Sequence, residues 1–534
     1  MMKPAPWQHQ VEAFERSKDA RAFGYFMEQR LGKSRVCVEK AARHYRRGEI
    51  DAVLVISYPS GVHTNWIVDE FSEWTPEDVP WCGLAWNSGK ASQVNYRETF
   101  DGLLAFKDLA VLSVNCEALI SDACKKAISR FFKVRRAVMT IADESSFMAN
   151  WCRRTRTMLS VAKHSAIRVI CDGTPADEGP FDLYFPMQFL DPTIVGMESP
   201  TAFRHHYAEL ETHGDRAYYE ALGREKKIAL AAGSSEEEAQ RVAETKARRV
   251  GRSWLSVKQY RNIDDLQARL APYTYRKTRV ECFDVPAKVY QKLRFDLDPE
   301  CRRVYDKLRD EFVVELKTGE LSVGMKIVRL IRLQQICSGY YPEQVVGAFC
   351  AQCEGDGCDA CDGVGVVEGT IPMQRIGRTN QRIEALRQSL KALAGPAVVW
   401  SRFVQDVDDV MALGLQLDRN PVRYDGRCSD EEKLHARRAF QSGESRLIVG
   451  NEASLQRGIR LDRAAAIYGY ANHFSLRMRR QVEDRAESHE RTVGTGVIDL
   501  VANDTVDDTL IIPALREKRR IADMVMGNAP AAWL

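Results

Sequence analysis

Short apolar runs alternate with helical stretches over the first 215 or so residues of the chain. Five runs are rich in β-branched and aromatic residues, and four of the five lead directly into a polar turn or one that contains Gly or Pro. This alternation is typical of a parallel sheet whose strands are connected by helices, with the chemistry at the turns. The predicted strands are 22–27, 51–57, 109–114, 137–142 and 167–171.

The pattern changes at about residue 216, where long helices are predicted as far as residue 335. Residues 234–252 carry acids first and bases last, and Ser234 with Glu237 forms a capping-box pattern, which predicts a solvated helix. A second alternating region then predicts strands at 396–400, 446–450, 465–470 and 496–501. The sequence therefore predicts an α/β fold with two parallel-sheet units joined by a helical segment.

Composition and charge narrow the class of protein. A chain of 534 residues with 45% hydrophobic and 28% charged residues is expected to form two or three globular domains. The net charge of +3 excludes a chain that is basic throughout, but it leaves room for a local basic cleft. No run approaches the roughly 18 apolar residues of a membrane span, and the first ten residues lack the apolar core of a signal peptide. We therefore expect a cytoplasmic protein without a membrane partner.

The first candidate for chemistry is Gly32-Lys33-Ser34, which follows the predicted strand 22–27. In a phosphate loop, backbone N–H groups wrap the phosphates, the lysine neutralises them, and the hydroxyl binds magnesium. The glycine expected five residues before Gly32 is Met27, and a Gly-Lys-Ser triplet is common by chance. The interpretation therefore depends on partner carboxylates elsewhere.

An acidic pair supplies such partners. The strand 137–142 runs into Asp143-Glu144, where the first carboxylate could hold magnesium and the second could orient and polarise an attacking water. An isolated Asp-Glu would more simply be a helix start that favours acids. Two further features favour the functional reading: strand 167–171 leads into the turn 172–175, and Gln10 lies just ahead of the loop strand.

These blocks, in this order, resemble the Swi/Snf-type branch of the superfamily-two helicases. The first half contributes "PWQHQVEAF", "MEQRLGKS", "VLVISYPSGVHTNWIVDEF", "LAVLSVNCEAL", "IADESS" and "DGTPADEGPFDLYFPMQFLDP". The second half contributes "VRLIRLQQICSGYY", "VVWSRF", "YDGRCSDEEKLHARRAF", "LIVGNEASLQRGIRL" and "QVEDRAES". The compact chain is similar to phage-encoded members, for which the host cytoplasm is the expected location. The resemblance implies two RecA-like lobes and hydrolysis of ATP with Mg2+.

The resemblance also implies a role for each matching residue. In the first lobe, Gln10 would read the adenine, and the turn at 173–175 would couple the nucleotide state to the DNA cleft. The remaining first-lobe residues would hold phosphates and magnesium or carry out hydrolysis: Gly32, Lys33, Ser34, Asp143 and Glu144.

In the second lobe, the resemblance places Gly458 near the nucleotide and assigns Gln481 and Arg485 to the block that completes the ATP site. Arg485 would be the arginine finger that stabilises charge on the transferring phosphoryl group.

Three departures from the family pattern bear on activity. Met27 and Arg30 stand where glycines are usual, and Arg30 would strain a tight turn unless the backbone there is ordinary. The acidic motif reads Asp-Glu-Ser-Ser, so the histidine link to the next motif is absent. Ser488 occupies the place of a second arginine, with Arg491 out of register. Because the groups that touch phosphate and metal are retained, we expect active hydrolysis rather than a binding-only protein.

The expected partner is double-stranded DNA, gripped mainly through its phosphates and largely without sequence preference. Candidate contact turns are 57–66, 113–119, 401–406 and 451–458. Within the first, Trp66 is interpreted as a packing residue rather than a base-stacking platform.

A cysteine repeat lies between the two alternating regions. Residues 350–365, "CAQCEGDGCDACDGVG", contain two copies of Cys-x-x-Cys-x-Gly-x-Gly, which resemble the zinc segment of DnaJ-type chaperones. Four thiolates would form a closed tetrahedral Zn2+ site, with unligated or redox-active thiols as the alternative. Such a site would be structural, and the insertion could grip DNA or a protein partner. The four cysteines are Cys350, Cys353, Cys358 and Cys361.

These predictions divide the chain into an ATP-binding lobe (1–215), a helical connector (216–335), a zinc-binding insertion (336–375) and a second lobe (376–534). The leading hypothesis is a double-stranded DNA translocase that remodels DNA in replication, recombination or repair. A strand-separating DNA or RNA helicase and a nucleotide-gated protein-remodelling factor are the alternatives. Dependence of the ATPase on polynucleotide, and then strand displacement, would distinguish them.

Overall fold

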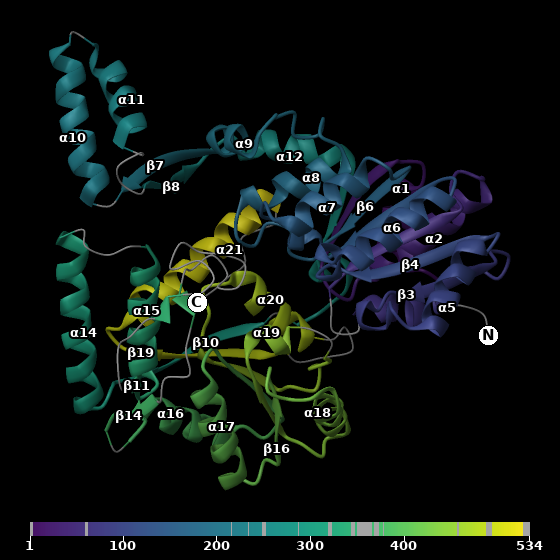
Figure 1. Cartoon of the computed structure of the whole chain (residues 1–534). Helices are drawn as coiled ribbons and strands as arrows, with labels where there is room; N and C mark the ends of the chain where they lie inside the picture. Colours follow the sequence, from purple (N-terminus) through teal and green to yellow (C-terminus); the bar gives the residue numbers. More distant parts are fainter. Residues whose placement is uncertain are drawn as a thin grey trace.

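The computed structural model consists of two lobes, each built on a parallel sheet (Figure 1). It describes residues 4–58, 62–214, 216–232, 234–247, 253–286, 288–318, 323–342, 348–349, 366–367, 373–377, 379–456, 459–487 and 494–526. No helix within these ranges is long and apolar enough to cross a membrane.

The first sheet has seven parallel strands in the order β3-β4-β2-β5-β6-β1-β9. All five strands predicted for this lobe are present, and their carboxyl ends meet at one edge of the sheet, where the candidate loop and acidic pair follow them. The sequence missed the two strands at the edges, β3 and β9. The strands are β1 (Ala22–Met27), β2 (Ala52–Ser57), β3 (Trp81–Ala85), β4 (Leu109–Asn115), β5 (Val138–Asp143), β6 (Ile167–Cys171) and β9 (Thr274–Lys277).

Helices cover both faces of this sheet because residues on each strand alternate in direction. In β2, Leu54 and Ile56 join one apolar core while Val53 and Val55 join the other. One face packs against α5 (Val94–Ala105), α6 (Asp122–Val134), α7 (Arg153–Ala162) and α8 (Tyr184–Leu190). The other packs against α1 (Gln8–Ser17), α2 (Lys33–Arg46) and the π-helical turn η1 (Trp66–Phe71), which lies between α3 (Val62–Asn65) and α4 (Ser72–Trp74).

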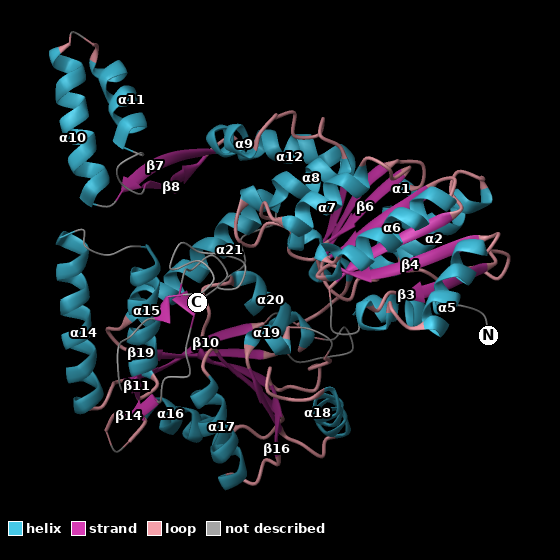
Figure 2. Ribbon diagram, viewed as in Figure 1, coloured by secondary structure: helices cyan, strands magenta, loops and turns pink. Residues whose placement is uncertain are grey.

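The second sheet has six parallel strands in the order β10-β19-β18-β15-β17-β16. Its strands are β10 (Val289–Phe295), β15 (Ala397–Ser401), β16 (Pro421–Tyr424), β17 (Leu447–Gly450), β18 (Ala466–Ala471) and β19 (Gly496–Ala502). The described helices of this lobe are α14 (Pro299–Thr318), α15 (Val323–Cys337), α16 (Gln381–Ala392), α17 (Val404–Gln416), α18 (Asp430–Ser442), α19 (Glu452–Leu455), α20 (Leu476–Arg485) and α21 (Ile512–Met526). Two parallel-sheet lobes confirm the predicted α/β fold (Figure 2).

The segment expected as a helical connector also contains strands. Residues 274–277 form β9 at the edge of the first sheet, and 289–295 form β10 at the edge of the second. The chain therefore crosses between the lobes over only a short stretch, which includes α13 (Arg279–Cys282).

An arm projects from the first lobe (Figure 1). It begins after α9 (Pro200–Tyr207), consists of the antiparallel pair β7 (Ala208–Gly214) and β8 (Ser253–Tyr260), carries α10 (Arg216–Ala231) and α11 (Glu236–Ala247), and returns through α12 (Ile263–Leu270). The cap of α11 differs from the predicted pair by one residue, because Ser235 Oγ accepts the Glu238 N–H at 3.3 Å.

The cysteine segment is bracketed by two short antiparallel ladders. The outer ladder pairs β11 (Tyr340–Pro342) with β14 (Met373–Arg375), and the inner one pairs β12 (Ala348–Phe349) with β13 (Val366–Val367). The ladders bring the two ends of the segment together. The four cysteines themselves lie outside the described residues, and within the described part of the chain no cluster of metal-ligating side chains occurs.

Helix α21 belongs to both lobes. Leu515 and Ala522 pack into the core of the second lobe, whereas Val525 is buried in the core of the first. Gln267 of α12 also donates a hydrogen bond to the carbonyl of Met524 at 2.5 Å. Figure 1 shows this helix running between the lobes.

Candidate functional site

The predicted phosphate loop connects β1 to α2. Met27 is a buried strand residue paired with Lys277, so its side chain belongs to the core and the turn begins after it. Gly32 has φ +72°, and a Cβ at this position would lie 2.0 Å from Gln10 Nε2. The left-handed backbone therefore favours glycine here, and a Cβ would also displace the amide end of Gln10. The side chain predicted to read adenine thus packs directly on the loop.

Lys33 opens α2, where the first amides of the helix have no partners within the helix and favour anions. Its Nζ donates to the carbonyl of Met27 at 2.7 Å and to that of Glu28 at 3.3 Å. The ammonium is therefore held over the mouth of the turn. A glycine cradle, helix amides and a lysine directed at the loop together fit a bound phosphate chain.

Ser34 meets a carboxylate that the sequence pattern does not single out. Its hydroxyl hydrogen-bonds to Glu70 on η1, a half-buried residue. Burial raises the pKa of Glu70 to about 7, and the Ser34 hydrogen bond opposes this rise. The negative charge of Asp143 also favours the protonated form of Glu70, which places the three side chains in one electrostatic cluster.

The acidic pair lies where β5 ends. The indole Nε1 of Trp66 donates to Asp143 Oδ2 at 2.9 Å, and this tryptophan is buried. Burial raises the pKa of Asp143, and the Trp66 hydrogen bond opposes the change. The interpretation of Trp66 as a packing residue is thus confirmed, and its hydrogen bond also holds the carboxylate.

Glu144 adopts a left-handed backbone with φ +55°. Burial raises its pKa to about 8, and the nearby positive charges of Lys33 and Arg485 oppose the rise. Glu144 Oε2 is buried and has no hydrogen-bond partner among the described residues. A buried, unsatisfied carboxylate oxygen beside the loop is chemically suited to accept a hydrogen bond from a reacting water.

Asp172 joins the acidic motif to the turn that follows β6. Its Oδ2 accepts the Ser146 N–H at 2.8 Å and the Ser145 hydroxyl at 3.2 Å, and its Oδ1 accepts the Thr174 N–H at 2.9 Å. The Asp-Glu-Ser-Ser motif lacks the usual histidine link. Here the fully buried carboxylate of Asp172 connects the acidic motif to the turn after β6 instead.

Helix α20 of the second lobe carries both Gln481 and Arg485. The positive charge of Arg485 opposes the rise in the pKa of Glu144, so the guanidinium lies within electrostatic reach of that carboxylate. Its Nε donates to the carbonyl of Gln456 at 2.9 Å. Gly458 and Ser488, the other second-lobe residues of interest, lie outside the described residues.

Arg30 reaches across to the same helix end. Its backbone is left-handed, with φ +65°, as the glycine pattern of this turn suggests. Its Nη2 donates to the Arg485 carbonyl at 2.8 Å, and its Nη1 donates to that of Glu487. Asp462 Oδ2 lies 3.6 Å from Nη1. Burial lowers the pKa of Arg30 to about 10, which leaves the side chain charged at neutral pH.

Ion pairs extend this contact between the lobes. Arg480 pairs with Asp177 at 2.6 Å, and Arg477 pairs with Asp182 at 2.6 Å. Arg279, in the crossing segment, pairs with Asp484 of α20 at 3.0 Å. These partners are buried or nearly so, and the site is therefore described with its two lobes in contact.

Sequence reasoning identifies the loop, the acidic pair and α20, but it misses the residues that connect them. Glu70 and Asp172 belong to recognised blocks, yet only the fold brings them to Ser34 and to the acidic motif. Arg30 stands out in the sequence only as an irregularity of the turn, and the two carbonyls to which it donates lie more than 450 residues away in the chain. No local sequence signal could have found that contact.

Two of the four predicted DNA-contact turns include residues outside the described ranges, 59–61 and 457–458. The other two turns, 113–119 and 401–406, follow β4 and β15 at the carboxyl edges of their sheets. These positions are compatible with contact turns, and their role stays a prediction.

The fold and the site together define the class of protein. A phosphate-type loop and an acidic pair on one parallel-sheet lobe face an arginine-bearing helix from the other, which makes the chain similar to helicase-like ATPases.

A particular relative is the human DNA annealing helicase and endonuclease ZRANB3, which is 19% identical over 481 residues. The match covers 89% of this chain but 36% of that protein, so the chain spans about a third of its relative's length. No family model matches the chain. Assignment to the compact, phage-encoded members stays a prediction.

Two solved structures are also similar, both of the SWI2/SNF2 ATPase core of Sulfolobus solfataricus. The core in complex with dsDNA is 16% identical with a TM-score of 0.37, and the match covers 95% of this chain and 90% of that one. The core domain alone has the same identity and TM-score, with 97% and 89% covered. The fold class of this chain rests on its own two sheets.

Proposed function

We propose that the protein is a DNA-dependent ATPase of the Swi/Snf type that moves along double-stranded DNA and remodels it. The observation that carries the proposal is the placement of Arg485, from the second lobe, within electrostatic reach of Glu144 on the first. A site completed by two lobes can couple each hydrolysis event to their opening and closing. The similarity to ZRANB3 and to an ATPase core bound to dsDNA supports the choice of duplex DNA as partner.

The first lobe would bind the phosphates. Lys33 would exchange its two carbonyl partners for phosphate oxygens, while the amides at the start of α2 would donate to them. Gln10, packed on Gly32, would contact the base beside the loop. Magnesium, when bound with the nucleotide at Ser34 and Asp143, supplies positive charge that neutralises the phosphates.

Glu144 would orient and polarise the attacking water. Its Oε2, which has no hydrogen-bond partner among the described residues, is available to accept the hydrogen bond. Arg485 would stabilise the negative charge that develops on the transferring group. Because Arg485 comes from the other lobe, only the closed arrangement is competent.

The first experiment measures ATP hydrolysis by the purified protein without polynucleotide and with matched single-stranded DNA, double-stranded DNA and RNA. Strong stimulation by duplex DNA is expected, and raised salt should remove it because phosphate contacts release counterions. A Lys33→Ala protein that hydrolyses ATP at the wild-type rate would contradict the assignment of the ATP site. Salt-independent stimulation would contradict the DNA interface.

Two other functions are outcomes of the same assay. Hydrolysis that is indifferent to every polynucleotide would favour a nucleotide-gated protein-remodelling factor. Displacement of a strand from a tailed duplex would indicate a helicase rather than a translocase.

The cysteine repeat is proposed to be a structural zinc site. The ladders β11–β14 and β12–β13 support this reading because they close the ends of the segment and make it a self-contained insertion. Four thiolates in two Cys-x-x-Cys pairs suit Zn2+. We further propose that the insertion contacts DNA or a protein partner, and that the biological process is DNA replication, recombination or repair.

A further inference from the structure

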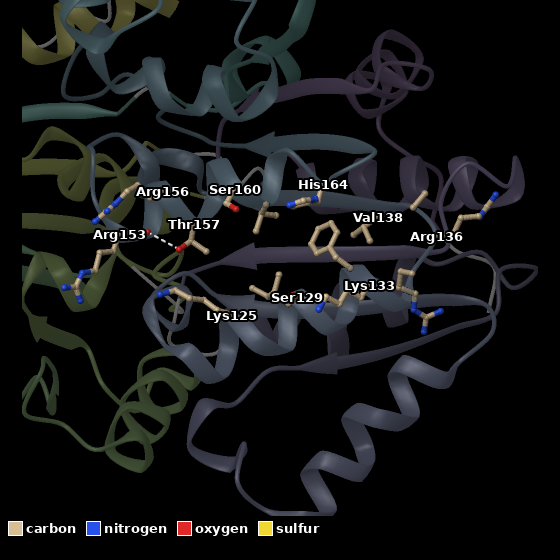
Figure 3. A pocket seen from close by; sticks show the side chains of 15 residues that line it. Lys125, Ser129, Lys133, Arg136, Val138, Arg153, Arg156, Thr157, Ser160 and His164 are labelled. Carbon is tan, nitrogen blue, oxygen red and sulfur yellow. Dashed lines mark hydrogen bonds between the residues drawn. The ribbon is translucent and has the colours of Figure 1, made fainter.

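A large groove lies on the first lobe, away from the nucleotide site. It has a volume of about 790 Å3 and runs between α6 and α7, two helices that cover the same face of the sheet (Figure 3). Its floor is apolar and includes Ile128, Phe132 and Val161. Nothing in the proposed hydrolysis requires this groove.

The rim of the groove is basic. Five exposed cations line it, and no carboxylate does. Among the described residues, the one ion pair within 4 Å that these cations make joins Lys125 to Asp122 at 3.9 Å. In a chain whose net charge is only +3, such a concentration produces a local positive potential that attracts a polyanion. The cations are Lys125, Lys133, Arg136, Arg153 and Arg156.

Aromatic side chains accompany the charges. On the floor, the half-buried Phe132 lies with its ring centroid 6.3 Å from that of the exposed His164. Near Arg156, Trp151 is 60% exposed, and the guanidinium carbon lies 6.0 Å from its ring centroid. Aromatic surfaces within a basic groove are the combination that binds unpaired bases and their phosphates.

The direction of the groove relates it to the site. Figure 3 places Arg153 and Arg156 at the end facing the second lobe, and Arg136 at the far end. Arg153 also begins α7, the helix that follows the acidic motif. The groove therefore leads from the region between the lobes along the outer surface of the first.

We propose that this groove is a second nucleic-acid site, which takes single-stranded DNA with its phosphates on the basic rim and its bases against the aromatic floor. Single-stranded DNA is favoured over duplex because paired bases are stacked inside the helix and cannot reach a floor set between two protein helices. The proposal goes beyond movement on duplex DNA: the protein would hold an unpaired strand at the same time.

The test measures binding of a fluorescent oligothymidine by anisotropy at several salt concentrations, with the full-length chain. The double variant Arg153→Gln/Arg156→Gln is expected to weaken binding about tenfold or more at low salt. Removal of two phosphate-binding arginines should also reduce the slope of log K against log salt by about 1.4. Phe132→Leu keeps an apolar side chain but removes the ring, and it should weaken binding about fivefold.

The matched control is Arg46→Gln/Arg47→Gln, which removes two exposed arginines from the end of α2 on the opposite face of the sheet. It should bind the oligonucleotide as the wild type does. Thermal unfolding of each variant checks that the fold is retained.

Wild-type affinity and salt slope in the Arg153/Arg156 variant would overturn the proposal. So would an equal loss of affinity for duplex and single-stranded DNA, since the groove would then belong to the duplex site. Duplex-stimulated ATP hydrolysis should be unchanged in the groove variant. If only the ATPase proposal fails, the protein will not hydrolyse ATP. It will still bind single-stranded DNA, and the groove variant will still weaken that binding.

Discussion

Arg30 offers a direct test of how the lobes complete the site. Arg30→Ala and Arg30→Gly both remove the guanidinium that holds the carbonyls of Arg485 and Glu487. They differ in the backbone, because alanine at φ +65° keeps the strain of a left-handed residue, about 1–2 kcal/mol, and glycine relieves it. The pair therefore separates the cross-lobe hydrogen bonds from the conformation of the turn.

The size of the effect follows from the hydrogen bonds that the guanidinium makes. A hydrogen bond to a charged group contributes about 1.5–3 kcal/mol, and both variants remove two of them. The carbonyls at the end of α20 regain water in either variant, which offsets part of the destabilisation. The ion pair with Asp462 at 3.6 Å adds less. A net destabilisation of the closed arrangement by about 1–2 kcal/mol corresponds to a decrease of about 5- to 30-fold in its population.

The assay is steady-state ATP hydrolysis at saturating duplex DNA, together with thermal unfolding. Both variants should lower kcat by about 5- to 30-fold with a smaller change in KM for ATP, because the two hydrogen bonds position Arg485 in the closed state. Arg30→Gly should unfold at a higher temperature than Arg30→Ala, because it carries less strain.

A control and two contrary results define the test. Arg460→Ala removes an exposed arginine that pairs with the same Asp462 at 2.9 Å but leaves the end of α20 untouched, and its kcat should match the wild type. Wild-type kcat in both Arg30 variants would refute the role of the cross-lobe bonds. Recovery of kcat in Arg30→Gly but not in Arg30→Ala would assign the effect to the strained turn instead.

Three further predictions concern other parts of the chain. Asp172→Asn weakens the acceptor of the Ser146 and Thr174 N–H groups, so the free energy of unfolding should fall by about 2 kcal/mol. DNA stimulation of the ATPase should fall more than the basal rate. Equal changes in both rates would contradict a coupling role. Burial raises the pKa of Asp406 to about 7, so the folded protein keeps a proton that the unfolded chain releases near pH 4. Denaturant unfolding at several pH values should therefore show stability falling as the pH rises from about 4 to 7. Asp406→Asn should flatten this slope, and an unchanged profile in the variant would disprove the role of Asp406. Purified protein should contain about one zinc ion per chain, less in Cys353→Ser, and a zinc-free preparation with full activity would argue against the site.

Much of the fold could be predicted because each central strand is a local apolar run. The run 167–171 matches β6 at both ends, since it lies within the sheet and is followed at once by the polar Asp172. The edge strands were harder. β3 contains Gly83 and is only partly buried, and β9 is four residues long and reaches the first sheet after the arm has intervened. Pairing across such a separation leaves no periodic signal.

The same division applies to the site. Lys33 and Asp143 follow apolar strands, and residue type and position together predicted their chemistry. The residues that connect these groups are a different case: an aspartate that follows one strand gives no indication that it will bind the amide of Ser146, in the turn after the neighbouring strand. Likewise, the left-handed turn at Arg30 is a local feature, but the carbonyls that it meets belong to another lobe.

Helix α21 sets a thermodynamic condition on movement of the lobes. Because Val525 is buried in the first core while Leu515 is anchored in the second, the lobes cannot separate freely unless the helix bends or Val525 is exposed to water. Exposing one fully buried valine costs about 1.5–3 kcal/mol. The helix would then resist opening of the lobes. Part of the free energy released by each cycle of ATP hydrolysis would be used to expose Val525 when the lobes open, and it would be recovered when they close. Shortening the chain before Val525 would remove this resistance and leave both parallel sheets intact.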